Sequence, residues 1–472
     1  MERNYELYVN GHRRALQQMR VSIMPFNRHW PGHQRTLDQT EVTAFASFEF
    51  VAKTEITVDC DFDFERVCIR PLSLGIHPTV KGRRISFTIE RPCQAVLEID
   101  GTRSALHLFA DPVRQKPVLS PDDLYFGPGE HHVGRIVLKS NQTVHLDEGA
   151  VVYGEIYGEG VENVAILGRG ILDHSQCEPS ETDPLIIDPP RPSPIEIRYA
   201  KGLVIKDVIV RDPCFLTVRP ICCEDLLIDN IKIIGCWRYN SDGIDLINCR
   251  NGVISNCFVR TFDDSLCLKG FHFPLQGEMF YRGKTYDTME NVTFENCVVW
   301  NEWGHALHVG VDLCAKEIKN CRFLNCDVIH TEGSALNISS CDYAEVSDIV
   351  YENIRVELDE KTLPPQLQKS DDDVYSPSED VPYMPHLFVL HVTKNEYSCG
   401  GTKRSKISGV SFRNIQVYAP SMPPSFLAGY DEEHAVRDIS FQSVTRNGTP
   451  LQSAEALRLT VKDFVDGLTI EP

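Results

Sequence analysis

Short strand-like runs separated by turn residues make up the first part of the chain. Residues 84–89 alternate polar and apolar side chains, as in a strand with one buried face, and Asp100-Gly101 is a typical hairpin turn. Residues 1–115 therefore predict a β-sandwich domain. The stretch 116–133 is rich in Pro and Gly, which indicates a linker and the cap of a second domain.

A repeat of short apolar segments follows from residue 134 to residue 472, with no helical pattern between the segments. In six segments an Asn precedes an apolar residue or a Cys, at Asn230, Asn256, Asn296, Asn325, Asn353 and Asn414. Their separations of 26, 40, 29, 28 and 61 residues indicate one repeat with long insertions around residues 270–290 and 358–405. A β-rich repeat of this size predicts an all-β fold, a parallel β-helix, over residues 134–472.

Successive coils of a parallel β-helix rise by roughly 4.8 Å, so equivalent side chains stack on one another. We expect the repeated Asn side chains to hydrogen-bond along a ladder at the bend between two sheets. We also expect Cys257, Cys297 and Cys326 to stack inside the coils, because a buried Cys behaves as a small apolar side chain.

The charge balance restricts the possible partners. With 47 Lys+Arg against 67 Asp+Glu, the formal net charge is -20, which disfavours nucleic acid and membranes because both require a basic protein surface. No stretch reaches the roughly 20 apolar residues of a membrane span, and the first residues lack the apolar core of a secretion signal. We therefore expect a cytoplasmic protein; an exported form would require a signal that has been removed.

Cysteine is frequent, with 17 residues, and 12 of these fall between Cys214 and Cys341 in apolar strand-like runs. Buried thiols explain this placement, and we expect all or nearly all of them to be reduced. The spacing offers no paired C-x-x-C ligands of the zinc type. We expect no metal and no cofactor.

Acidic residues on consecutive coils form the strongest candidate site. Asp242 ends one predicted coil, and Asp263 and Asp264 end the next, 21 and 22 residues later. Three carboxylates stacked in this way repel one another, which raises at least one pKa and lets one group remain a protonated acid while another is an ionised base. Hydrolysis of a glycosidic bond needs this division of roles.

Three short stretches resemble the motifs of the family 28 glycoside hydrolases, which are polygalacturonase-like enzymes with a right-handed parallel β-helix. They are N-S-D at 240–242, D-D at 263–264 and G-H-A at 304–306. The β-sandwich before the solenoid is similar to that of the dextranase and isopullulanase group. The resemblance implies that Asp263 is the general acid, that Asp242 and Asp264 activate water with inversion at the anomeric carbon, and that His305 orients or tunes the acid, with Asn240 beside them.

The resemblance breaks at the fourth motif, where the family carries an Arg and a Lys that bind the uronate carboxylate. Here Asn337 and Ser339 occupy those positions, and neither can replace a charge-assisted pair. The substrate is therefore either a neutral sugar or a uronate bound by another cation, for which Lys269 is the candidate. Glu332 is a further candidate for the cleft.

Two other functions fit the same solenoid. A polysaccharide lyase would hold Ca²⁺ with the acids and use Lys269 as the base, although Arg260 is the one Arg near these motifs. A non-catalytic carbohydrate-binding solenoid would line its cleft with aromatic side chains, and Trp237, Tyr239, Trp300 and Trp303 do flank the acids. We predict a glycosidase that acts on a poly- or oligosaccharide. Endo or exo action would depend on the two insertions or on residues 30–35.

Overall fold

The structure is a computed structural model of the chain. It describes residues 3–28, 35–114, 117–177, 192–270, 280–359, 362–370, 372–378, 383–395, 398 and 403–472. The regular elements of these residues are strands, apart from two single 3-10 turns at Leu37–Gln39 and Leu72–Leu74. The described residues include no helix with the length and apolar character needed to cross a membrane. The chain divides into two compact units, one of Met1–Ile23 with Thr36–Ser120 and one of Met24–Arg35 with Pro121–Pro472. The all-β prediction is confirmed.

The first unit is a sandwich of two five-stranded sheets. The first sheet has the order β2 (His12–Arg14), β1 (Tyr5–Val9), β6 (Thr54–Cys60), β9 (Arg84–Ile89), β8 (Thr79–Lys81). The second has the order β3 (Gln17–Ser22), β5 (Thr40–Phe50), β11 (Leu106–Pro112), β10 (Cys93–Ile99), β7 (Val67–Arg70). Their inner faces share one apolar core, to which β9 contributes Ile85, Phe87 and Ile89, the apolar positions of the predicted alternation.

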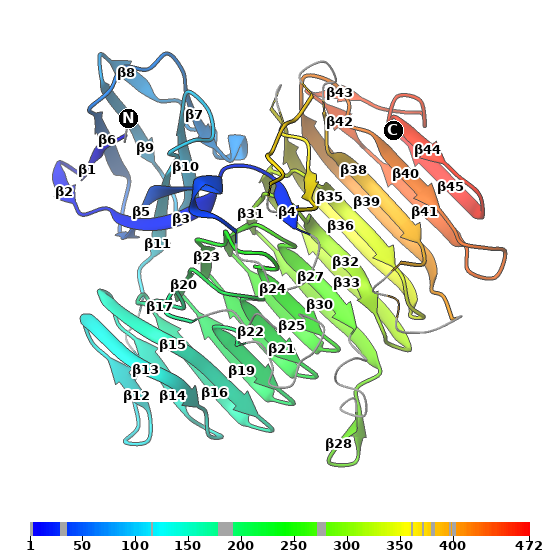
Figure 1. Cartoon of the computed structure of the whole chain (residues 1–472), viewed down its shortest axis with the longest axis horizontal. Helices are drawn as coiled ribbons and strands as arrows, with labels where there is room; N and C mark the ends of the chain where they lie inside the picture. The colour runs from blue at the N-terminus through cyan, green and yellow to red at the C-terminus, as the bar shows by residue number, and fades with distance from the viewer. Residues whose placement is uncertain are drawn as a thin grey trace. The chain divides into compact units, whose positions relative to one another are not determined.

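The second unit is dominated by one sheet of 31 strands that winds through the successive coils (Figure 1). Its first strands are β12 (Leu124–Phe126), β13 (Gly129–Val137), β14 (Thr143–Leu146), β15 (Ala150–Glu159) and β16 (Glu162–Gly168). Its last strands are β40 (Ser425–Ala428), β41 (Val436–Gln442), β42 (Thr445–Arg446), β43 (Thr449–Pro450), β44 (Leu459–Val461) and β45 (Val465–Glu471). The sheet therefore begins at residue 124, inside the stretch expected to be linker and cap.

Between these ends the coils build three parallel ladders. The first contains β18 (Ile195–Arg198), β21 (Val218–Ile221), β24 (Ile244–Ile247), β27 (Leu266–Gly270), β32 (His305–Leu313), β35 (Ser334–Ser340) and β38 (His386–Val392). The second contains β19 (Lys201–Lys206), β22 (Glu224–Asp229), β25 (Arg250–Ser255), β30 (Thr288–Glu295), β33 (Glu317–Leu324), β36 (Glu345–Glu357) and β39 (Lys406–Tyr418). The third contains β17 (Ile171–Asp173), β20 (Ile209–Arg211), β23 (Lys232–Ile234), β26 (Phe258–Thr261), β31 (Val298–Asn301) and β34 (Asp327–His330).

The repeated Asn residues lie at the bend between the second and third ladders, in left-handed backbone conformations with φ of 49° to 56°. Asn tolerates this conformation better than most residues, which explains its recurrence there. The Nδ2 of Asn325 donates to Oδ1 of Asn296 at 2.6 Å, and that of Asn414 donates to Oδ1 of Asn353 at 2.7 Å. The predicted Asn ladder is confirmed. Towards the start of the solenoid, Asp side chains take the place of Asn in the ladder; for example, Asn256 donates to Asp229.

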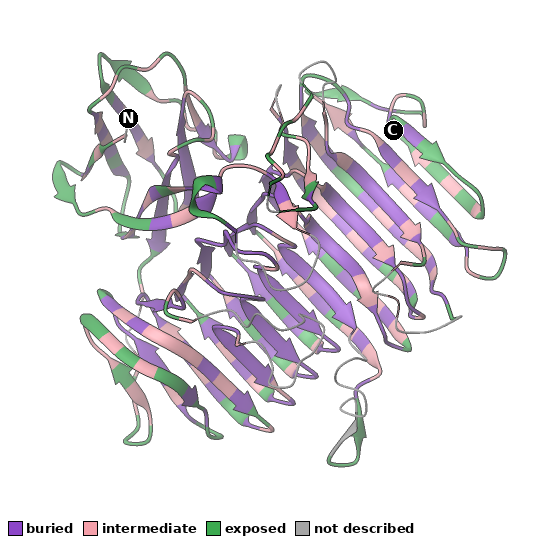
Figure 2. Cartoon of the chain, viewed as in Figure 1, coloured by how far each residue is buried: buried purple, intermediate pink, exposed green. Residues whose placement is uncertain are grey.

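The solenoid core is stacked in register. Cys257, Cys297 and Cys326 are fully buried, as predicted. Five aromatic rings form a second column with centroids 4.8 to 5.1 Å apart, close to the strand spacing: Phe294, Phe323, Tyr351, Phe412 and Phe441. Figure 2 shows the resulting alternation of buried and more exposed residues along these strands.

Most cysteine thiols agree with the expectation of a reduced state. Fifteen described cysteines are not disulfide-bonded, and twelve of these are buried. Cys314 is the exception because it is disulfide-bonded. The expectation therefore holds at fifteen positions and is wrong at Cys314, where sequence spacing carried no signal.

Both predicted insertions contain short extra strands. The first carries the hairpin of β28 (Phe280–Tyr281) and β29 (Lys284–Thr285), and its residues 271–279 lie outside the described residues. The second carries β37 (Gln366–Gln368), which pairs in parallel with β4 (Phe26–Arg28). Residues 30–34, considered above for the end of a cleft, lie outside the described residues, as do parts of the second insertion.

Candidate active site

The three aspartates lie at the turns that lead from the third ladder back to the first. Asp242 precedes β24, and Asp263 with Asp264 lies between β26 and β27 on the next coil. The backbone N–H of Gly243 donates to the carbonyl of Asp264 at 2.8 Å, which sets the two turns directly against each other. His305 begins β32 one coil further on, and its backbone N–H donates to Oδ1 of Asp264 at 3.0 Å. The predicted stacking of the acids is confirmed.

These turns line a cleft of about 600 Å³ in the second unit. All seven residues predicted for the site line it: Asn240, Asp242, Asp263, Asp264, Lys269, His305 and Asn337. Ser339 lines it as well, whereas Glu332 is not among the lining residues. Lining residues that the sequence analysis did not identify include Asn27, Arg28, His308, Asp312, Ser334, Tyr383, His386, His391 and Phe426.

Lys269 lies buried at the centre of the acids. Its Nζ is 2.6 Å from Oδ2 of Asp242, 3.1 Å from Oδ2 of Asp264 and 3.3 Å from Oδ1 of Asp245. Asp245 was not predicted, although it stands three residues after Asp242 in the same segment. One ammonium group therefore faces three buried carboxyl groups, and it is not available to bind a substrate carboxylate.

The environment separates the pKa values of these groups. Burial would raise the pKa of Asp264, but the charge of Lys269 holds it well below its usual range. Burial raises the pKa of Asp242 well above its usual range against the opposing charge of Lys269. Burial would lower the pKa of Lys269, but the charges of Asp242, Asp245 and Asp264 raise it. Lys269 is therefore protonated, and Asp264 is ionised.

Asp263 is the acid that remains partly exposed in the cleft. Burial, together with the negative charge of Asp264, raises its pKa to about 7. Its Oδ1 accepts the backbone N–H of Asp264 at 3.0 Å, and its carbonyl accepts Nδ2 of Asn301 at 2.7 Å. Asp263 thus has the protonation state and the fixed position of a general acid near neutral pH.

A short chain of polar groups orients His305. Nδ2 of Asn337 donates to Oγ of Ser334 at 2.9 Å, and that oxygen is 2.8 Å from Nδ1 of His305. Because Ser334 already accepts from Asn337, its hydroxyl is placed to donate to Nδ1, which leaves the imidazole proton on Nε2. Burial lowers the pKa of His305 and lowers that of His308 to about 3, so both rings are neutral near pH 7.

The family model for glycosyl hydrolases family 28 matches residues 131–362, which include all three aspartates and His305. The β-helix of this chain belongs to glycosyl hydrolase family 28. The chain is therefore a glycosidase. No curated protein matches the sequence significantly.

Among the solved structures that share the fold of this chain are Dex49A and an exopolygalacturonase. Dex49A from Penicillium minioluteum is 13% identical, with a TM-score of 0.65 over 99% of this chain and 93% of that chain. A hyperthermoactive exopolygalacturonase from Thermotoga maritima is 16% identical, with a TM-score of 0.52 over 74% of this chain and 84% of that chain. At these identities the likeness concerns the fold, and it confirms the right-handed parallel β-helix with a preceding β-domain.

Fewer of the predicted aromatic side chains line the cleft than expected. Trp237 and Trp300 are buried, the first donating its Nε1–H to Asp212 at 2.8 Å and the second packing under Arg260 at 3.7 Å from its ring centroid. Tyr239 is also buried. Trp303 lines the cleft and is therefore the member of the predicted set that is placed to contact a sugar.

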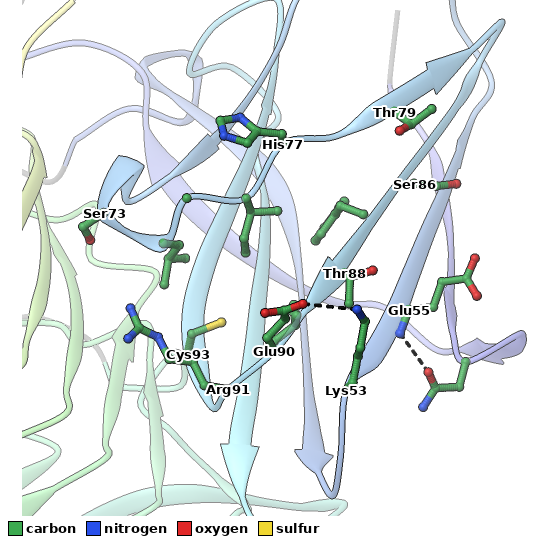
Figure 3. A pocket seen from close by; sticks show the side chains of 16 residues that line it. Lys53, Glu55, Ser73, His77, Thr79, Ser86, Thr88, Glu90, Arg91 and Cys93 are labelled. Carbon is green, nitrogen blue, oxygen red and sulfur yellow. Dashed lines mark hydrogen bonds and ion pairs between the residues drawn. The ribbon is translucent and has the colours of Figure 1, made fainter.

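The β-sandwich carries a second hollow of about 1230 Å³ (Figure 3). Its charged pair, Lys53 and Glu90, is held at 3.2 Å with both side chains more than two-thirds exposed. Water screens the interaction of such an exposed pair, so the pair contributes little to stability.

Gly304, the first residue of the G-H-A stretch, is required by close packing. A Cβ built on it would lie 2.6 Å from Oδ1 of Asp263, 2.7 Å from Oδ1 of Asp264 and 2.6 Å from the Asp264 nitrogen. The backbone of Gly304 therefore packs directly against Asp263 and Asp264, and any side chain at this position must displace them.

We expect Gly304→Ala to lower kcat by about 10²-fold, the usual effect of misplacing a catalytic group by about 1 Å. Overpacking should cost about 1–3 kcal/mol of the free energy of unfolding. Steady-state kinetics and urea unfolding measure the two effects. Gly252→Ala is the matched control, since its Cβ would meet nothing closer than 3.5 Å; equal activity of the two variants would contradict the packing argument.

Proposed function

We propose that the chain hydrolyses glycosidic bonds with inversion of configuration, with Asp263 as the general acid and Asp264 and Asp242 as the groups that hold and deprotonate water. The observation that carries the proposal is the unequal environment of the two adjacent acids. The pKa of Asp263 is raised to about 7, while Asp264 is kept ionised by Lys269. One group can therefore give a proton at the pH where the other can accept one.

The reaction follows from this assignment. Asp263 donates its proton to the glycosidic oxygen as the bond from that oxygen to the anomeric carbon breaks. A water oxygen held between Asp242 and Asp264 forms the new bond to the anomeric carbon from the opposite face, and Asp264 accepts its proton. Proton exchange with solvent restores both acids. Inverting enzymes usually hold the acid and the water-holding carboxylates roughly 6.5–9.5 Å apart, so that the water fits between them. Oδ1 of Asp263 and Oδ1 of Asp264 lie closer than this here, since both come within 2.7 Å of one Cβ position at Gly304, so the first-formed anomer is the direct test of inversion.

Charge in the cleft favours a neutral sugar at the cleavage site. Lys269 is neutralised by carboxylates, and the positions that would bind a uronate hold Asn337 and Ser339. Burial lowers the pKa of both His386 and His391, so these cleft residues are neutral near pH 7. Among the described lining residues Arg28 is the other cation, against four Asp residues. A polyuronate would therefore lack the charge-assisted pair that binds its carboxylates in the family motif.

The arrangement argues against a lyase. A lyase base must be unprotonated, whereas the carboxylates around Lys269 raise its pKa. The ammonium group of Lys269, 3.1 Å from Oδ2 of Asp264, would repel a Ca²⁺ ion bound by that carboxylate. Arg260 is engaged by Glu302 at 2.6 Å and is buried, so it cannot neutralise a uronate.

Incubation with a panel of neutral and acidic glycans tests the proposal. We expect new reducing ends from a neutral glycan, little or no product from polygalacturonate, and proton NMR of the first product showing the anomer opposite to that of the bond cleaved. Retention of configuration would refute the assigned roles. An ultraviolet-absorbing unsaturated product would indicate a lyase, and preferential cleavage of polygalacturonate would refute the neutral-sugar assignment.

A further inference from the structure

A cluster of one His and two Cys residues lies outside the catalytic cleft. His174 follows β17 directly, and Cys177 is three residues further along; Cys214 stands three residues after β20 on the next coil. The two strands pair with Asp173 opposite Arg211, and the backbone N–H of His174 donates to the Arg211 carbonyl at 3.0 Å. Ladder register therefore brings together side chains that are up to 40 residues apart in the sequence.

The three side chains are close enough to share one ion. One ligand atom from each lies within 4.8 Å of the others, and the two sulfurs are 3.3 Å apart. His174 and Cys214 are almost fully buried, whereas Cys177 is partly exposed, which provides a route of entry. Sulfurs bound to one tetrahedral zinc lie roughly 3.8 Å apart, given a Zn–S distance of about 2.3 Å. A small rotation of either side chain accommodates this spacing.

The surroundings suit a cation bound by thiolates. The Cys214 thiol donates to the Cys177 sulfur, and the His174 ring lies beside both sulfurs. Glu155 lies beside the cluster, with its Oε2 4.0 Å from Nε2 of His174. Its Oε1 forms an ion pair with Arg135 at 2.6 Å. Thiolate, imidazole and carboxylate together are the ligands that zinc and similar thiophilic metals prefer.

We propose that His174, Cys177 and Cys214 bind one thiophilic divalent cation of the zinc type, with Glu155 or water as the fourth ligand. On binding, the thiols of Cys177 and Cys214 release their protons to solvent, and both sulfurs coordinate as thiolates. The ion ties the end of one coil to the next. It also supports the coil that carries Asp242, because Arg238 on that coil donates to the Pro213 carbonyl beside Cys214 at 3.3 Å.

Titration of the reduced, chelator-treated full chain with Co²⁺ and Zn²⁺ tests this site. We expect one equivalent of Co²⁺ to bind with a sulfur-to-cobalt charge-transfer band, which Zn²⁺ then displaces. Cys214→Ser and Cys177→Ser should each weaken binding by more than the roughly 10–100-fold that loss of an outer-shell contact costs. Cys93→Ser is the control, because Cys93 is a partly exposed Cys of the other compact unit and should leave binding unchanged.

A measurement on the unchanged protein covers the case in which a variant does not fold. Zn²⁺ should protect Cys177 from alkylation and raise the Tm of the wild-type chain, and a chelator should reverse both effects. Binding without the charge-transfer band would overturn the proposal, as would unchanged binding in both folded Cys variants or the absence of Zn²⁺ protection. These readouts do not involve glycan hydrolysis, so they stand apart from the proposed catalytic roles.

Discussion

Replacing Asp263 by Asn is expected to lower kcat by about 10²- to 10⁴-fold, the usual contribution of general acid catalysis. The amide keeps the shape of the carboxyl group and can still accept the backbone N–H of Asp264 at the position of Oδ1. It cannot give a proton to the leaving oxygen. KM and Tm should therefore change little, which steady-state kinetics and thermal unfolding would show.

The pH profile provides an independent check on this role. A general acid must be protonated, and the pKa of Asp263 is about 7. The wild-type kcat should therefore fall as pH rises above about 7, and this falling limb should be absent from Asp263→Asn. Asp312→Asn is the matched control, because Asp312 lines the same cleft. The ion pairs of Lys269 are instead with Asp242, Asp245 and Asp264. If Asp312→Asn lost as much activity as Asp263→Asn, the assignment of the acid would be wrong.

The second large effect is expected from Lys269→Met. Removing the ammonium leaves Asp242, Asp245 and Asp264 buried without their counter-charge, and breaking a buried ion pair in this way costs about 3–5 kcal/mol. Activity should fall as well, because the pKa of Asp264 rises when the charge that holds it down is removed. Urea unfolding at several pH values measures the loss.

The sign of the pH dependence follows from the shifted pKa of Asp264. In the wild type this pKa is lowered in the folded state, so its contribution to stability is present above the unfolded pKa of about 3.9 and is lost as pH falls. The stability gap between wild type and Lys269→Met should therefore narrow below about pH 4. Lys206→Met is the control, because Lys206 pairs with Asp229 at 2.9 Å but is nearly half exposed. We expect this substitution to lower the free energy of unfolding by less than about 1 kcal/mol. Equal costs for the two variants would show that Lys269 does not stabilise the acid cluster.

Fold class and the position of the acids could be read from the sequence, because both depend on a repeat. A solenoid stacks equivalent positions, so the recurring Asn before a Cys or apolar residue identified the bend of each coil. The spacing of Asp242 to Asp263 then identified adjacent coils. Asn325 donating to Asn296, and the contact of Gly243 with Asp264, follow from this local periodicity alone.

Contacts that depend on the direction of a side chain, or on segments outside the repeat, required the tertiary structure. The sequence suggested Lys269 as a cation for substrate, but its side chain turns inward to three carboxylates. Arg28 reaches the cleft because its strand pairs with an insertion more than 300 residues away. Cys177 meets Cys214 through the register of two coils rather than through motif spacing. Periodicity specifies which residues share a ladder, but long-range packing and desolvation decide which side chains meet and which are charged.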